Sequence, residues 1–190
     1  MLRAAKQCFA THGYEKTTLR QVARDAHVDA AMVLYLFGSK AELFRESMRL
    51  VLDPDVLAAE MTGGRPADLG VRLVRVYLRI WDEPDTGPSL VTMVHSATTN
   101  PDAREAFRDF MCGYVLAAIQ DVLGEGPDSR LRANLAGTSL VGAAMLRYVM
   151  RVGPLADLST AEVVELIAPS VQRYLTAGAD ELGLPERYRA

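Results

Sequence analysis

The sequence has 190 residues, of which 49% are hydrophobic and 24% charged, and its net charge is −3. This composition is that of a folded globular protein and excludes a disordered chain. Two cysteines are too few for a disulfide framework, and no apolar run is long enough to cross a bilayer. No signal peptide is recognisable, so we expect a cytoplasmic protein without membrane association.

Charge is divided unevenly along the chain. Residues 1–52 hold eight Lys and Arg against five Asp and Glu, whereas the remainder holds 13 basic and 19 acidic residues. A basic N-terminal end on an acidic body indicates that this end meets a polyanion.

Apolar residues recur at spacings of three and four in nearly every segment, which predicts an all-α fold. The expected helices cover residues 2–13, 18–26, 29–37, 43–51, 67–82, 88–98, 101–123, 128–152 and 159–177. Between the fourth and fifth of these, Asp53-Pro54 is expected to end a helix and residues 63–66 to form a linker. The tail from Gly178 to Ala190 is expected to be loosely ordered.

The two short helices at 18–26 and 29–37 form the most informative pattern. Thr18 and Gln21 have the spacing of a helix N-terminal cap, and Asp29 can cap the next helix. Val33 and Phe37 then point back into a shared core. A helix-turn-helix has this pattern, and so does an ordinary corner between two helices of a bundle. The pattern alone leaves both interpretations open.

Residues 8–44, CFATHGYEKTTLRQVARDAHVDAAMVLYLFGSKAELF, resemble the TetR family of bacterial transcriptional regulators. The matching positions are Phe9, Gly13, Tyr14, Thr17, Thr18, Val22, Ala23, Ala26, Val28, Val33, Phe37, Lys40 and Leu43. The resemblance implies an all-α homodimer with a three-helix DNA-binding domain at residues 1–45. It also implies a larger helical ligand-binding and dimerisation domain at residues 46–190. In this family the ligand favours the form that does not fit the operator, so binding of the effector releases DNA.

The resemblance places the DNA contacts on the second and third helices, just before the second helix and at the start of the fourth. The candidate DNA-binding residues are Thr17, Thr18, Arg20, Asp29, Ala30, Ala31, Met32, Tyr35 and Lys40. The recognition helix itself, DAAMVLYLF, lacks Arg, Lys, Asn and Gln, which make paired hydrogen bonds to base edges. Readout is therefore expected from Tyr35, from small and apolar side chains against thymine methyl groups, or from DNA shape.

The turn between these helices departs from the family pattern. The family has glycine where this chain has His27, and we expect His27 to adopt a positive φ. Leu34 and Leu36 stand where the family has tyrosine and histidine.

An uncharged run from Ala133 to Leu146 predicts a helix that is buried on all sides. We expect it to pair with the capped helix at 159–177 and to form a four-helix dimer interface with a second copy. The candidate interface residues are Ala133, Ala136, Gly137, Leu140, Ala144, Val163, Ile167, Val171 and Tyr174. The alternative is a central helix of a monomer.

Large apolar residues gather in the middle helices and suggest a small-molecule pocket. The candidate ligand-binding residues are Tyr77, Trp81, Met93, His95, Phe107, Phe110, Met111 and Tyr114. An ordinary helical core has the same composition, and His95 in particular fits a core or interface position.

No catalytic constellation, metal-ligand spacing or phosphate-binding loop is present, so we expect neither an enzyme nor a cofactor. The predicted function is that of a ligand-released repressor, with an inverted-repeat duplex, a second copy and a small-molecule effector as partners. Three alternatives stay open: a DNA-binding dimer without an effector, a thiol sensor, and a small-molecule-binding helical protein. In the last of these, the DNA-binding domain at residues 1–45, here called the head, has degenerated. Cys8 and Cys112 both resemble inert core thiols, which argues against the sensor.

Overall fold

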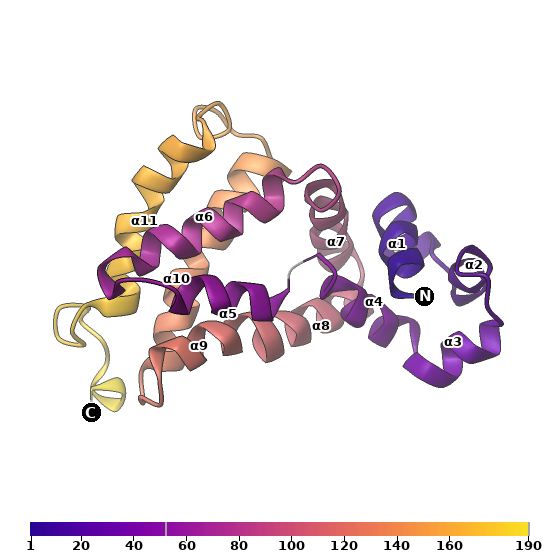
Figure 1. The fold of residues 1–190 in the computed structure, drawn as a ribbon, viewed down its shortest axis with the longest axis horizontal. Helices are drawn as coiled ribbons and strands as arrows, with labels where there is room; N and C mark the ends of the chain where they lie inside the picture. Colours follow the sequence, from indigo (N-terminus) through magenta and orange to yellow (C-terminus); the bar gives the residue numbers. More distant parts are fainter. Residues whose placement is uncertain (52, 190) are drawn as a thin grey trace. The chain divides into compact units, whose positions relative to one another are not determined.

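The computed structural model describes residues 1–51 and 53–189, apart from the side chains of Pro54 and Tyr114 (Figure 1). The described residues form helices and turns without any strand, so the predicted all-α class is confirmed. The chain divides into two compact units. The first comprises Met1–Asp53 and Asp82–Gly113, and the second comprises Pro54–Trp81 and Tyr114–Ala190.

The first unit contains the N-terminal helices and two helices from the middle of the chain. These are α1 (Leu2–Lys16), α2 (Leu19–Asp25), α3 (Ala30–Phe37), α4 (Lys40–Met48), α7 (Gly87–Thr99) and α8 (Pro101–Phe110). Helix α1 packs against α7 and α4, and α4 also packs against α8, as Figure 1 shows. The ring of Phe44 meets those of Phe9 and Tyr14 edge-on at 4.9 and 5.2 Å. Three aromatic side chains therefore anchor α4 to α1.

Each of the three short helices that follow α1 begins with a side-chain cap. Thr18 accepts from the N–H of Gln21 at 3.2 Å, Asp29 from Ala31 at 2.7 Å, and Ser39 from Glu42 at 3.0 Å. The caps expected at Thr18 and Asp29 are thus confirmed. Since isolated helices of this length are unstable, the caps and the packing of Val22, Ala23 and Val33 hold them together.

The turn between α2 and α3 has the expected left-handed residue. His27 has a φ of 55°, which confirms the prediction made from its alignment with a glycine. The N–H of His27 donates to Arg24, and that of Val28 donates to the carbonyl of Ala23. These two bonds form a Schellman motif, which ends α2 and sets the direction in which α3 begins.

The second unit contains α5 (Pro54–Thr62), α6 (Leu69–Asp82, up to Trp81), α9 (Leu116–Leu123), α10 (Ser129–Ala144) and α11 (Thr160–Thr176). Helix α10 packs against α9 and α11, and α5 packs against α9. Helices α6 and α11 touch at Gly70, where a Cβ atom would lie 2.6 Å from the carbonyl oxygen of Ala168. A capping box formed by Ser159 and Glu162 opens α11, which confirms the cap expected at the start of the helix at 159–177.

Three expectations about secondary structure need correction. The segment after Asp53 forms α5, because Pro54 starts a helix as readily as it ends one. The helices expected at 101–123 and 128–152 each contain a π-helical turn, at Met111–Val115 and Met145–Val149. The tail is not loose up to residue 189: Leu184 is buried, and Arg173 donates to the carbonyl of Glu181 at 2.7 Å.

Candidate nucleic-acid interface

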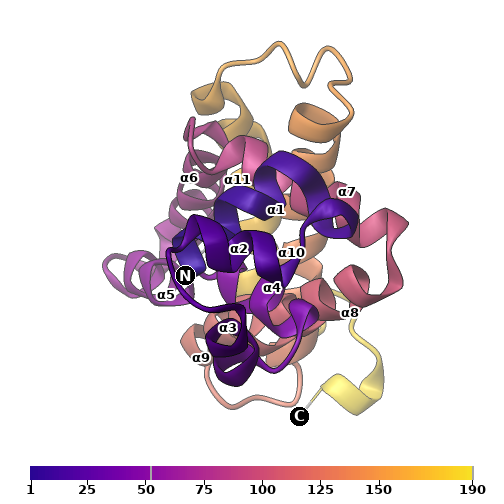
Figure 2. The ribbon, with the colours of Figure 1, turned by 90° about the vertical axis from the view of Figure 1, so that its right-hand side faces the viewer.

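Helix α3, which lies beside α2 in Figure 2, turns a nearly apolar face to the surface of the first unit. Tyr35 is 88% exposed, and around it Met32, Leu34 and Leu36 are 48%, 52% and 53% exposed. Val33 is fully buried on the opposite side and packs α3 into the unit. The helix is therefore held by one face, while the other offers large side chains that no neighbouring element covers.

Polar groups border this face on the side of α2. Thr18 and Arg20 are exposed, and Arg20 forms no described ion pair. Asp29 is also exposed, but its carboxylate is occupied in capping α3. At the start of α3, Ala30 is partly exposed and Ala31 is exposed. Seven of the nine predicted DNA-binding residues, Thr18 to Tyr35, thus lie together around one surface.

Thr17 does not belong to that surface. Its side chain is buried, and its hydroxyl donates to the carbonyl oxygens of Cys8 at 3.0 Å and Gly13 at 2.8 Å. The structure therefore gives Thr17 a role in closing the end of α1, and the DNA contact expected of it is corrected.

Lys40 is also committed to the protein. Its Nζ donates to the backbone carbonyl of Glu15 at 3.1 Å and lies 4.4 Å from the centre of the Tyr14 ring. Burial lowers the pKa of Lys40, while Glu15 and Asp102 oppose that change. The ammonium group ties the start of α4 to the end of α1, and a phosphate contact by Lys40 stays a prediction.

The end of α1 is joined to α7 and α8 by two further polar contacts. The backbone N–H of Tyr14 donates to the hydroxyl of Ser96 at 3.1 Å. The side-chain amide of Asn100, which caps α8, donates to the carboxylate of Glu15. Gly13 permits this geometry, since its φ of 72° bends the chain out of the helix just before Tyr14. Helices α1 to α4 and α7 are thus parts of one cohesive unit.

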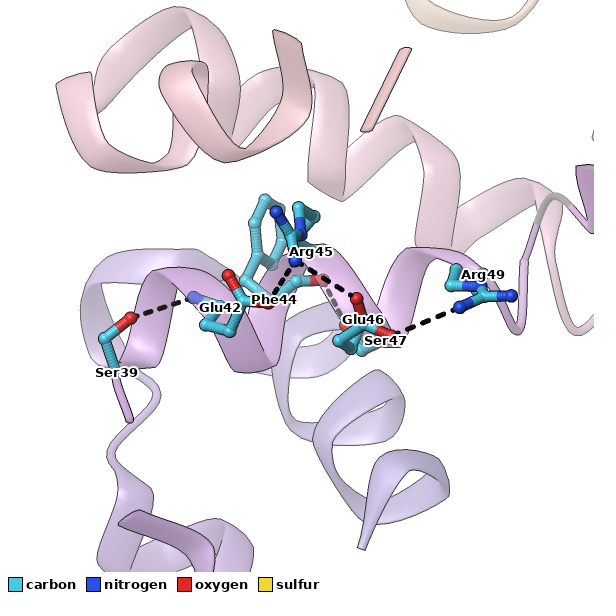
Figure 3. Close-up of polar contacts among 7 residues, drawn as sticks. All are labelled: Ser39, Glu42, Phe44, Arg45, Glu46, Ser47 and Arg49. Atoms are coloured by element: carbon cyan, nitrogen blue, oxygen red, sulfur yellow. Dashed lines mark hydrogen bonds and ion pairs between the residues drawn. The ribbon is translucent and has the colours of Figure 1, made fainter. Parts of the chain in front are cut away.

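Helix α4 carries a line of alternating charges, shown in Figure 3. Arg45 pairs with Glu42 and, at 3.4 Å, with Glu46, which in turn lies 3.6 Å from Arg49. On the opposite side the hydroxyl of Ser47 is buried and donates to the carbonyl of Phe44 at 2.7 Å. Pairs at these spacings stabilise the helical conformation of α4.

The candidate ligand-binding residues are divided between the two units. Tyr77 and Trp81 lie in the second unit, whereas Met93, His95, Phe107, Phe110 and Met111 lie in the first. Met93 and Phe110 are buried and Phe107 and Met111 partly so, but His95 is exposed and is no core residue. The side chain of Tyr114 lies outside the described residues. Pocket lining by this set stays a prediction.

Tyr77 and Trp81 belong to an aromatic cluster in the second unit. Their ring centres are 6.2 Å apart, and Trp81 stacks on Tyr148 at 5.3 Å. Burial raises the pKa of Tyr77, and a hydrogen bond with Trp81 partly offsets this. A separate hollow of 510 Å³ lies between α6 and α11, with Val71, Arg75, Val164 and Glu165 in its walls. None of the candidate ligand-binding residues lines it.

Most of the candidate interface residues face the core of their own unit. Ala133, Ala136, Leu140, Ala144, Val163 and Val171 are buried, and only Gly137, Ile167 and Tyr174 are partly exposed. The buried six cannot form the outer face of these helices. That face carries instead Thr138, Val141 and Leu166, the last two 44% and 64% exposed. The sequence does not distinguish the buried side of α10 from its exposed side, because both sides carry mainly apolar or small residues.

The two cysteines differ in their surroundings. Cys8 is buried, and its thiol donates to a carboxylate oxygen of Asp25 at 3.3 Å. Burial, helped by this hydrogen bond, raises the pKa of Cys8 to about 11. Cys112 is exposed, so the expectation that it is a core thiol is wrong.

No group of three or more acidic, cysteine or histidine side chains suited to a metal ion occurs among the described residues. In the same part of the chain, no helix combines the length and the apolar character needed to span a membrane.

Comparison with known proteins gives consistent matches over nearly the whole chain. Residues 1–47 match the family model of bacterial regulatory proteins of the tetR family, and residues 67–175 match that of the tetracyclin repressor-like C-terminal domain. The HTH-type transcriptional regulator BetI of Agrobacterium fabrum is 24% identical over 173 residues, which cover 87% of this chain and 82% of BetI.

Solved structures show the same relationship. The crystal structure of a TetR-family regulator from Streptomyces coelicolor is 32% identical, with a TM-score of 0.69, and the match covers 92% of this chain and 91% of that one. The fatty acid degradation regulator FadR from Bacillus halodurans, at 20% identity, shares the fold with a TM-score of 0.63, over 93% and 96% of the two chains.

Proposed function

Because the chain belongs to the TetR family of bacterial transcriptional regulators, we propose that it binds an inverted-repeat operator as a homodimer and leaves it when a small molecule binds. The observation that carries this proposal is the outward face of α3. Tyr35 projects almost fully into solvent from a helix whose opposite face is buried at Val33. A helix held in this way is suited to the DNA major groove.

Each exposed residue around α3 has a role that fits its chemistry. The guanidinium of Arg20 and the hydroxyls of Thr18 and Tyr35 suit phosphate oxygens, and they fix the position of the head on the duplex. Ala31 and Met32 lie beside Tyr35 and face the base edges. Lys40 acts indirectly, because it holds the end of α1 against α4. We take residues 1–45 as the DNA-binding domain and residues 46–190 as the ligand-binding and dimerisation domain.

A second copy is the natural partner for the outer face of α10 and α11. Val141 and Leu166 are exposed there, with the uncharged Thr138 nearby in the sequence of α10. In a symmetric dimer the same patch of each copy meets that of the other, so the exposed apolar residues of both copies are removed from water. Two heads related by a two-fold axis require two half-sites in inverted orientation.

Effector binding can reach the head through contacts within the first unit. Helix α7 holds the end of α1 through Ser96 and Tyr14, and α8 holds it through Asn100 and Glu15. A ligand that shifts α7 therefore shifts α1, and with it α2 and α3. Release follows if the ligand prefers the arrangement in which the two heads no longer match the operator. Regulation of this kind needs no catalysis, and we place the protein in the cytoplasm with its DNA.

Selection of bound duplexes from a random library tests the proposal. The wild type should enrich an inverted repeat, Tyr35→Ala should lose the enrichment, and Val56→Ala, which trims an exposed apolar residue on α5, should keep it. Binding that shows no enriched sequence and vanishes as salt rises would overturn the proposal. It would favour instead a helical small-molecule-binding protein with a degenerate head, the reading that the apolar α3 keeps open.

A further inference from the structure

The outward face of α3 has almost no capacity to form hydrogen bonds with bases. Ala31, Met32, Leu34 and Leu36 contribute only carbon and sulfur, and the hydroxyl of Tyr35 is the one polar side-chain group of this helix. The carboxylate of Asp29 is already engaged with the N–H of Ala31 at 2.7 Å. Discrimination between base pairs by paired hydrogen bonds is therefore not available to this helix.

The same face is well suited to apolar groups in the major groove. Met32 and Leu36 are four residues apart and lie on one side of Tyr35, and both are about half exposed. Thymine presents a 5-methyl group in the major groove, and it is the apolar feature that distinguishes an unmodified base pair there. Contact between this methyl group and Met32 or Leu36 removes apolar surface from water on both sides.

We propose that α3 reads the 5-methyl group of pyrimidines, so that 5-methylcytosine substitutes for thymine in the operator. The inference rests on the proposed function and adds the chemistry of its specificity. Thymine and 5-methylcytosine carry the same methyl group but opposite hydrogen-bonding groups at the neighbouring position, an acceptor in one and a donor in the other. A helix without base-directed donors or acceptors responds to the methyl group that they share. Methylation of cytosine within the operator then strengthens binding.

Four duplexes that differ at one position distinguish the contribution of the methyl group to affinity from that of the hydrogen bonds. Each thymine of the selected half-site is kept or replaced by uracil, with adenine opposite, or is replaced by cytosine or 5-methylcytosine, with guanine opposite. The Kd of the full-length protein is then measured for each duplex. At the contacted positions, thymine and 5-methylcytosine should bind alike. Uracil and cytosine should bind about fourfold more weakly, the ratio expected for one methyl-sized apolar group. Replacement in both half-sites should weaken binding about 16-fold.

Variants on the protein side locate the contact. Met32→Gln and Leu36→Gln keep the length of a side chain but add a polar amide, and at least one should abolish the difference between thymine and uracil. Because both residues are exposed, these variants should fold. Val56→Gln, on an exposed apolar residue of α5, should leave the difference unchanged.

The possible failures are distinct. An enriched operator that contains no thymine, or one on which uracil binds as well as thymine at every position, overturns methyl readout while sequence-selective binding stands. DNA affinities that are the same in Met32→Gln, Leu36→Gln and wild type also overturn it. Absence of any selective duplex overturns both this inference and the proposed function.

Discussion

The backbone N–H of Tyr14 donates to the hydroxyl of Ser96 at 3.1 Å, across 82 positions of sequence. Gly13 turns the chain out of the helix immediately before this bond, so the N–H of Tyr14 needs an acceptor from outside α1. Ser96 is buried on α7 and donates in turn to the carbonyl of Thr92 at 2.9 Å. This short chain of bonds connects α1 to the helix through which we expect the effector to act.

Removal of this acceptor should destabilise the protein. Ser96→Ala leaves a buried N–H without a partner, and we expect the free energy of unfolding to fall by about 1–3 kcal/mol in denaturant titrations. Thr98→Ala is the matched control, since its hydroxyl is exposed and bonds only to His95 in the same helix. The control should change stability by less than about 0.5 kcal/mol. Equal stability of the two variants would show that Ser96 does not hold Tyr14.

The left-handed residue between α2 and α3 offers a stabilising substitution. His27 has a φ of 55°, which costs a non-glycine residue roughly 1–2 kcal/mol, whereas glycine loses about 0.5–1 kcal/mol of unfolded-state entropy. His27→Gly should therefore raise the free energy of unfolding by about 0.5–1 kcal/mol. Gln7→Gly, at an exposed helical position of α1, should lower it by a similar amount. A loss of stability in His27→Gly would argue against strain at this turn.

Charge placed on the outer face of α10 and α11 should separate the dimer. Leu166→Glu and Val141→Glu bring carboxylates into a patch that meets its own copy, so both repulsion and desolvation oppose assembly. Sedimentation should give the mass of one chain, 20.8 kDa, for these variants and twice that mass for the wild type. Val56→Glu, on α5, should remain dimeric. A dimer that survives both substitutions would move the interface elsewhere.

The two thiols should differ strongly in reactivity. At pH 8, Cys112 should react with an alkylating reagent at the rate of an exposed thiol, while Cys8 should stay protected until the protein unfolds.

The pKa of Cys8, raised from 9.0 to about 11, also affects stability. Its stabilising contribution is complete below pH 9 and is lost as the pH rises toward 11, because the unfolded thiol ionises first. Cys8→Ser should reduce this alkaline loss; an unchanged pH profile would contradict the assignment.

The sequence predicts the local features of the head well. The caps at Thr18 and Asp29 and the positive φ of His27 follow from short-range rules that a few neighbouring residues decide. The roles of Thr17 and Lys40 could not be predicted in this way. Both residues match the family pattern, but only the folded chain shows that the buried hydroxyl of Thr17 donates to Cys8 and Gly13. It also shows that Lys40 donates to the backbone carbonyl of Glu15.

The body of the chain shows a different limit. The apolar run from Ala133 to Leu146 indicated a buried helix but not which of its faces is buried, since small residues occupy every side. Most of the predicted interface residues consequently lie in the core of the unit, and the exposed Val141 and Leu166 were not among them. Burial of Leu166 is ambiguous from spacing alone, because α11 has apolar residues on both sides of its axis. Helix α5 was missed because Pro54 was taken to end a helix.

The proposed function requires contact between the outward face of α3 and DNA, and methionine methyl groups report on this contact directly. The chain has eight methionines, of which Met32 lies on this face and Met48, Met61 and Met93 are buried. In a protein with ¹³C-labelled methionine methyl groups, the selected operator should shift the Met32 signal, assigned with Met32→Leu, and change those of Met61 and Met93 far less. A scrambled duplex at the same concentration should shift it less. An unchanged Met32 signal on protein that is saturated with operator would contradict the account.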